Sequence, residues 1–115
     1  MSEKCLFCDI VQGRIPAEKI YEDEHVIAFN DIAPQAPVHV LIIPKEHLAG
    51  LKDLTDEHPA LLSSIHQASL KIAQEKSVYE RGFRLVVNSG PDAGQAVDHL
   101  HYHLLAGRKL NWPPG

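Results

Sequence analysis

The sequence has few of the residues that mark several large classes of protein. Its 115 residues include only two cysteines, too few for the disulfide framework of a small secreted domain. The longest apolar run, residues 38–44, falls well short of the roughly 20 residues that span a bilayer. Residues 1–4 are not a basic segment leading into a long apolar stretch, so no export signal is visible. We therefore expect a cytoplasmic protein with no membrane partner.

The charge balance argues against a nucleic-acid-binding protein. Lys and Arg total 11 and Asp and Glu total 15, which gives a formal net charge of -4. Binding to a phosphate backbone without sequence preference usually requires the opposite sign. The sequence contains no repeat, low-complexity tract or linker, and a chain of this length can build one good core but not two. We predict a single domain over residues 1–115.

Hydrophobic periodicity predicts two helices and five strands. The helices are expected over residues 5–12 and 55–78, with Thr55 as the N-cap of the longer one and Pro59 in its first turn. The strands are expected over residues 19–21, 25–29, 38–43, 82–88 and 99–105. One long helix and few possible parallel crossovers predict an α+β fold with an antiparallel sheet of about five strands. Because a small sheet with a free edge often pairs across a two-fold axis, we also expect a homodimer.

Histidine is unusually frequent, with eight residues, and three of them alternate in the segment His99-Leu100-His101-Tyr102-His103. Alternate side chains of a strand share a face, so these imidazoles would lie roughly 6 to 7 Å apart on one face. A solvated face, a metal site and a nucleophilic imidazole oriented by its neighbours all fit this pattern. The preceding residues 90–95 hold two glycines, and the backbone N–H groups of such a turn can bind phosphate. Together the two segments favour phosphoryl chemistry.

The two cysteines form the pattern Cys5-x-x-Cys8 at the start of the first predicted helix. This spacing lets both thiolates reach one ion, and Zn²⁺ accepts mixed cysteine and histidine ligands. By itself the spacing is a weak signal, and two free thiols are the alternative interpretation.

The sequence closely resembles the histidine triad (HIT) superfamily, whose motif is three histidines alternating with apolar residues. Residues 99–105 fit the motif, with Tyr102 at one apolar position. Residues 15–16, 29–32, 34–37, 43–45, 87–88, 94–95 and 107–108, and the closing Trp112-Pro113-Pro114-Gly115, resemble the Hint branch of purine nucleoside phosphoramidases. The resemblance extends from about residue 5 to the end of the sequence, so it implies a HIT-like fold whose sheet continues across a homodimer.

The resemblance implies hydrolysis of the P–N bond in AMP or GMP phosphoramidates. His101 would attack the phosphorus and form a nucleotidyl-histidine, which water then hydrolyses. His39 would lie behind His101 and tune it, while His103 and Gln95 would contact phosphate oxygens, with His99 completing the triad. The remaining implied nucleotide contacts are Asn88 and Gly94 with phosphate, Asp31 with the ribose hydroxyls, and Phe7, Ile10, Ile15, Phe29, Asn30 and Ile32 around the purine.

Two positions depart from the Hint pattern. Ala96 stands where the branch commonly has serine, whose hydroxyl is thought to assist the leaving amine, so slower turnover is expected. Asp98 stands where tyrosine is usual, and it either pairs with a histidine or faces solvent. A dinucleoside polyphosphate hydrolase or nucleotidyl transferase is an alternative, which the short tail disfavours. Ala96 also leaves open a nucleotide-binding protein without catalysis.

The resemblance further implies a structural zinc ion bound by Cys5, Cys8, His47 and His99. It implies that the tail, residues 107–115, reaches the partner subunit, where Trp112 lines the leaving-group pocket. The remaining histidines, His25, His58 and His66, are expected on the surface without a functional role.

Overall fold

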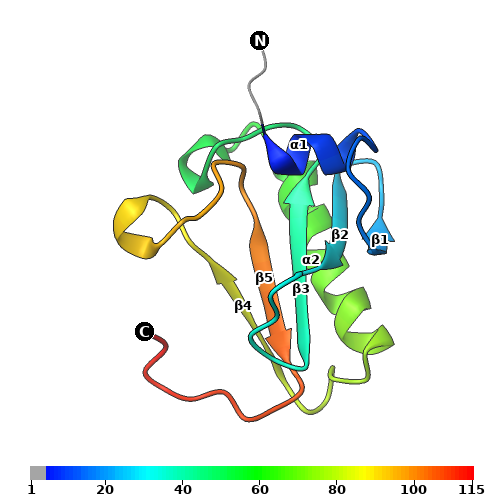
Figure 1. The fold of residues 1–115 in the computed structure, drawn as a ribbon, viewed down its shortest axis with the longest axis vertical. Coiled ribbons are helices and arrows are strands. Elements are labelled where there is room, and N and C mark those ends of the chain that lie inside the picture. The colour runs from blue at the N-terminus through cyan, green and yellow to red at the C-terminus, as the bar shows by residue number, and fades with distance from the viewer. Residues whose placement is uncertain (1–4) are drawn as a thin grey trace.

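The computed structural model describes residues 5–115, which form one antiparallel sheet with helices on its two faces (Figure 1). The strand order is β1-β2-β3-β5-β4. The strands are β1 (Lys19–Glu22), β2 (Val26–Asn30), β3 (Val38–Pro44), β4 (Phe83–Val87) and β5 (Tyr102–Ala106), and the helices are α1 (Leu6–Val11) and α2 (Pro59–Glu75). The α+β prediction with five antiparallel strands is confirmed. Within the described chain, no helix has both the length and the apolar character to cross a membrane.

The sheet separates two hydrophobic clusters because neighbouring side chains of a strand point to opposite faces. Val26 and Ala28 of β2 pack in the cluster that contains the buried side of α2. Ile27 and Phe29 of the same strand pack with Phe7 and Ile10 of α1. On the α1 face, this short helix lies at one end of the sheet (Figure 1).

Helix α2 starts at Pro59 with His58 as its N-cap, so the prediction that Thr55 caps the helix is wrong. Thr55 instead stabilises the preceding turn, where its Oγ1 accepts a hydrogen bond from the Glu57 N–H at 3.3 Å. Pro59 suits the first helical position because it has no N–H to satisfy. The helix also ends before residue 78, and Ser77 adopts a left-handed conformation with φ 61°.

The final strand begins at Tyr102 and not at His99. At this end of the strand, the outermost pair with β3 is Tyr102 with Ile42. Beyond this pair the backbone leaves the sheet, and the N–H of Leu100 donates to the carbonyl of Leu48 at 2.7 Å. The predicted alternation nevertheless persists, because Leu100, Tyr102 and Leu104 pack on the α2 side of the sheet.

The chain turns sharply after β5 at Gly107, which has a φ of 95°. A Cβ atom at this position would lie 2.8 Å from Cβ of Pro37, so both conformation and space favour glycine. Arg108 then donates from Nη2 to the carbonyl of Gln35 at 3.0 Å. These contacts fix the tail against the β2–β3 loop, and further along Trp112 is 78% exposed.

Candidate functional site

An apolar cavity of about 540 Å³ opens on the α1 face of the sheet. Ten of the residues predicted to contact substrate or catalyse the reaction line it: Phe7, Ile10, Ile15, Phe29, Asn30, Asp31, Ile32, Ala96, His101 and His103. The lining also includes six residues that sequence reasoning missed: Leu6, Pro16, Ala17, Glu18, Leu41 and Val97. Leu41 could have been found from the alternation of side chains in paired strands. It pairs with Phe29 on one side and His103 on the other, so all three side chains point to the same face of the sheet.

His101 is oriented by the backbone of its own segment. Its Nδ1 lies 2.7 Å from the carbonyl oxygen of His99, and a carbonyl can only accept, so Nδ1 carries the proton. In the neutral ring the other nitrogen, Nε2, then keeps its lone pair. The ring is 5% exposed and lies edge-on to Phe7, with centroids 5.2 Å apart. This arrangement presents a nucleophilic nitrogen at the cavity.

His39 contacts His103, and its implied place behind His101 stays a prediction. The backbone N–H of Gln35 donates to Nδ1 of His39 at 3.0 Å, which leaves the proton of the neutral ring on Nε2. That Nε2 is 2.9 Å from Nδ1 of His103. Since Nδ1 of His103 accepts this hydrogen bond, the neutral His103 carries its proton on Nε2. His103 therefore offers the cavity a hydrogen-bond donor.

The surroundings of His103 and His39 favour the neutral forms of these two rings. Burial lowers the pKa of His103 below its ordinary value, and the neighbouring His101 and His39 lower it further. Burial also lowers the pKa of His39, against the opposing effect of Asp31. The Asp31 carboxylate lies 3.4 Å from Nε2 of His39 through Oδ2, and its Oδ1 accepts from the N–H of Ala33 at 2.8 Å.

Several predicted contacts lie outside the cavity lining. Gln95 is engaged in its own loop: Oε1 accepts from the Gly90 N–H at 2.9 Å, and Nε2 donates to the carbonyls of Ala49 and Val97 at 2.7 and 3.0 Å. Contact with a phosphate would require one of these bonds to break, so that role stays a prediction. The same holds for the expected substrate contacts of Asn88, Gly94 and Trp112, which do not line the cavity either.

The other singled-out polar residues have simple surroundings. Asp98 faces solvent, which decides between its two alternatives. His66 is exposed on α2 as expected. His25 and His58 are half-buried, and Nδ1 of His58 accepts from the N–H of Thr55 at 3.2 Å.

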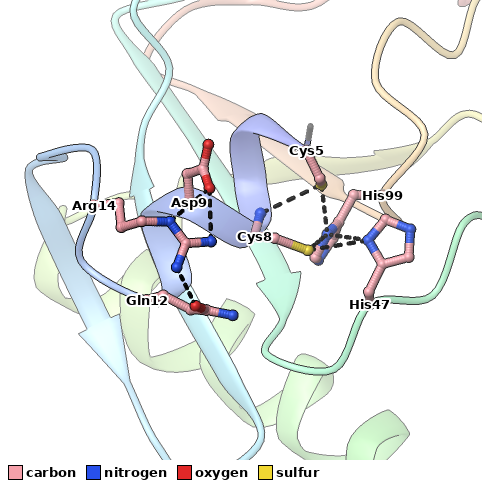
Figure 2. Close-up of polar contacts among 7 residues, drawn as sticks. All are labelled: Cys5, Cys8, Asp9, Gln12, Arg14, His47 and His99. Atoms are coloured by element: carbon pink, nitrogen blue, oxygen red, sulfur yellow. Dashed lines mark hydrogen bonds and ion pairs between the residues drawn. The ribbon is translucent and has the colours of Figure 1, made fainter. Parts of the chain in front are cut away.

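Cys5, Cys8, His47 and His99 converge beside α1, and we refer to them as the Cys2His2 cluster (Figure 2). The Nδ1 atom of His99 lies 3.4 Å from Sγ of Cys5 and 3.5 Å from Sγ of Cys8. The Nδ1 atom of His47 lies 3.1 Å from Sγ of Cys8 and 3.1 Å from Nδ1 of His99. All four donor atoms are within 4.8 Å of one another.

These distances match the edges of a tetrahedron around a zinc-sized ion. With Zn–S of about 2.3 Å and Zn–N of about 2.0 Å, tetrahedral geometry separates sulfur from nitrogen by about 3.5 Å and two nitrogens by about 3.3 Å. The ring of His99 is also oriented for a metal, because its Nε2 is 2.9 Å from the carbonyl of Pro44 and therefore carries the proton. The donor set and its spacing thus fit zinc.

The electrostatics of the cluster without a cation favour neutral ligands. Burial and the adjacent Cys5 raise the pKa of Cys8 to about 11. Burial lowers the pKa of His99. A bound cation would therefore have to displace the thiol protons, as Zn²⁺ does when it binds cysteine.

A five-stranded antiparallel sheet that presents alternating histidines over an apolar cavity defines this chain as a histidine triad protein. Residues 4–111 match the family described as "Scavenger mRNA decapping enzyme C-term binding". The chain is 50% identical to an uncharacterized HIT-like protein of Synechococcus elongatus, with 100% of both chains covered. It is 45% identical to a 14 kDa zinc-binding protein of Zea mays, over 96% of this chain and 87% of that one.

The solved structures agree with this assignment. A HIT family hydrolase from Legionella pneumophila superposes with a TM-score of 0.94 at 50% identity, covering 97% of this chain and 100% of that chain. The chain belongs to the HIT family, and its structural relatives include hydrolases.

Proposed function

We propose that this protein hydrolyses the P–N bond of AMP or GMP phosphoramidates through a nucleotidyl-histidine intermediate. Nε2 of His101 attacks the α-phosphorus, the P–N bond breaks, and the amine leaves with a proton taken from solvent. Water then attacks the phosphorus, the bond to Nε2 breaks, the nucleotide is released and one proton of the water returns to solvent. His101 returns to its neutral form at the end of the cycle.

The observation that carries this proposal is the orientation of His101. Its Nδ1–H is held by the carbonyl of His99 at 2.7 Å, so the lone pair of Nε2 is available at a cavity suited to a purine. A neutral imidazole nitrogen is a good nucleophile for phosphoryl groups. The size of the cavity, about 540 Å³, is within the usual range for small-molecule sites.

The remaining roles follow from the donors and acceptors around that nitrogen. His103 donates from Nε2 to a phosphate oxygen, and Asp31 accepts from the ribose hydroxyls. The apolar lining of the cavity, which includes Phe7, Ile10, Ile15, Phe29 and Ile32, surrounds the purine. Substitution of the residue that makes each contact tests its proposed role.

Steady-state hydrolysis of an AMP phosphoramidate of a simple amine tests the proposal. Wild-type turnover that disappears in His101→Ala supports the reaction and the nucleophile. Binding of AMP without turnover on any phosphoramidate would instead favour a non-catalytic nucleotide-binding protein. Ala96, which lines the cavity without a hydroxyl, is the residue that motivates this alternative. Turnover of dinucleoside polyphosphates alone would indicate the other hydrolase class.

We also propose that the Cys2His2 cluster binds a structural zinc ion. The donor distances and the zinc-binding relative support this assignment. Metal analysis of protein purified without chelators should find about one zinc per chain. Less than about half an equivalent, or full retention of zinc in Cys5→Ser, would contradict it.

A further inference from the structure

We propose that the Cys2His2 cluster positions the nucleophile and one wall of the cavity, with His99 as the positioning residue that connects them. Metal binding at the cluster would then be a condition for tight nucleotide binding, and not only a source of stability. The choice of AMP as the probe rests on the proposed function. The coupling itself rests on three sets of contacts around His99 and α1.

His99 takes part in the cluster and in the site at the same time. Its Nδ1 lies among the donor atoms of the cluster, and its Nε2–H donates to Pro44 at 2.9 Å. Its backbone carbonyl accepts from Nδ1 of His101 at 2.7 Å. The residue is completely buried and lies before the start of β5, so the sheet does not hold its carbonyl. The N–H of the same peptide unit, on Leu100, donates to the carbonyl of Leu48 at 2.7 Å. The side-chain contacts of His99 restrain this unit, which orients His101, from its other end.

Helix α1 connects the cluster to the cavity by a second route. It has only six residues, far fewer than a helix needs to be stable alone. Its N-cap, Cys5, and its third residue, Cys8, both belong to the cluster. Phe7 lies between them and lines the cavity. The ring of Phe7 is edge-on to His101 and also to His99, with centroids 5.2 and 5.9 Å apart.

The other end of α1 has an independent restraint. Nη2 of Arg14 lies 2.9 Å from Oδ1 of Asp9, on the side of the helix away from the cluster (Figure 2). This ion pair is exposed, so it contributes little. Without a cation, the four cluster donors would be joined only by hydrogen bonds among neutral thiols and imidazoles, such as the 3.1 Å contact between Nδ1 of His47 and Nδ1 of His99. Loss of the metal should therefore loosen the N-terminal half of α1, and with it both Phe7 and the carbonyl that orients His101.

The test removes the metal through a residue that does not line the cavity. His47 is exposed and contributes only its ring nitrogen to the cluster, so His47→Ala should lose zinc without changing the cavity lining. His66→Ala removes another exposed histidine and is the matched control. His47→Cys keeps a metal ligand and tests for rescue. Chelation of the wild type followed by addition of zinc alone makes the same comparison on one protein.

Three measurements accompany zinc analysis, all below the unfolding temperature of each variant. In His47→Ala we expect the Kd for AMP, measured by calorimetry, to rise at least about ten-fold. We expect kcat/KM to fall by about 100-fold, because small displacements of catalytic groups have effects of that size. The ¹⁵N spectrum of the His101 ring should change from one tautomer, protonated at Nδ1, to a mixture. His47→Cys and zinc addition should restore all three.

The opposite result would overturn the proposal. If His47→Ala stays folded and lacks zinc, yet binds AMP and shows the His101 spectrum of the wild type, the cluster is only structural. Failure of the proposed function is distinguishable. In that case zinc-loaded wild type would not hydrolyse phosphoramidates, while the His101 spectrum would still respond to zinc.

Discussion

Backbone groups hold three histidines of the site in one tautomer. The N–H of Gln35 donates to His39, and the carbonyls of Pro44 and His99 accept from His99 and His101 respectively. A backbone N–H can only donate and a carbonyl can only accept, so each ring has one possible neutral form. The free nitrogen of each ring then has a fixed role as donor, metal ligand or nucleophile. Ring orientation in this site is thus a property of the main chain.

Buried neutral histidines make stability depend on pH. Burial lowers the pKa of His39 and of His103 in the folded protein, while the unfolded chain binds protons with a pKa near about 6.5. The unfolded state therefore gains protons first as the pH falls. The free energy of unfolding is therefore highest above about pH 6.5. It decreases as the pH falls from there toward the lowered pKa values of these two histidines in the folded protein. Urea unfolding from pH 7.5 to 5.5 should show a decreasing free energy of unfolding.

A matched pair of variants tests that prediction. His103→Gln should flatten the dependence on pH, whereas His66→Gln on the exposed face of α2 should leave it unchanged. A free energy of unfolding that increases on acidification over this range would contradict the assignment of neutral rings.

Ala96 gives a second prediction at the residue scale. It lines the cavity, so a hydroxyl introduced there would be available to the leaving amine. We expect Ala96→Ser to raise kcat by roughly ten-fold, a modest part of what proton transfer can contribute. The measurement is steady-state turnover of one AMP phosphoramidate, with Ala93→Ser, in the adjacent exposed turn, as control. An equal or lower kcat in Ala96→Ser would show that another group protonates the amine.

The residue scale also shows what the sequence could predict about the site. The alternating motif singled out His101 and His103, and the CxxC spacing singled out Cys5 and Cys8. The other predicted residues of the cavity, and the two histidines of the Cys2His2 cluster, came from the resemblance to the HIT superfamily. The partner of His39 could not be predicted, because it depends on the register of β3 against β5. The loop bonds of Gln95 were equally inaccessible, since they involve the carbonyl of Ala49, 46 residues away.

At the scale of elements, periodicity predicted the helices and strands more accurately than their ends. Local propensity made Thr55 a good N-cap, but a proline four residues later is also a good first helical residue, and the chain uses the second signal. The start of β5 is set by a contact that is distant in sequence. Its pairing with β3 stops at Ile42, two residues before β3 ends at Pro44, and Leu100 bonds to Leu48 instead.

Two adjacent leucines of α2 provide a test of its packing. Leu61 is 5% exposed and packs in the core cluster under the sheet, while Leu62 is 46% exposed. Leu61→Ala should lower the free energy of unfolding by about 2 to 5 kcal/mol through lost burial and a cavity. Leu62→Ala should cost less than about 1 kcal/mol. Urea denaturation of the two variants measures the difference, and equal costs would contradict the orientation of α2.

At the scale of the whole molecule, the sheet has an available edge. β4 is the last strand in the order, and Leu85 at its centre is 40% exposed. An edge of this kind is open to pairing with a second copy. We propose a homodimer in solution, with the tail reaching the partner's site. Light scattering at micromolar concentration should give twice the chain mass of 12.8 kDa, and a monomeric mass would contradict it.

The turn at Gly107 also determines which sequences this fold can accept. A side chain at this position would meet Pro37 and would require a backbone conformation that only glycine adopts easily. Substitution of Gly107 would therefore force either the β2–β3 loop or the tail to move, although Gly107 and Pro37 have no role in the proposed reaction. In a library that randomises the chain and selects for turnover, this position should tolerate the fewest alternatives of any exposed site. The direction of the tail thus depends on the absence of a side chain at one residue.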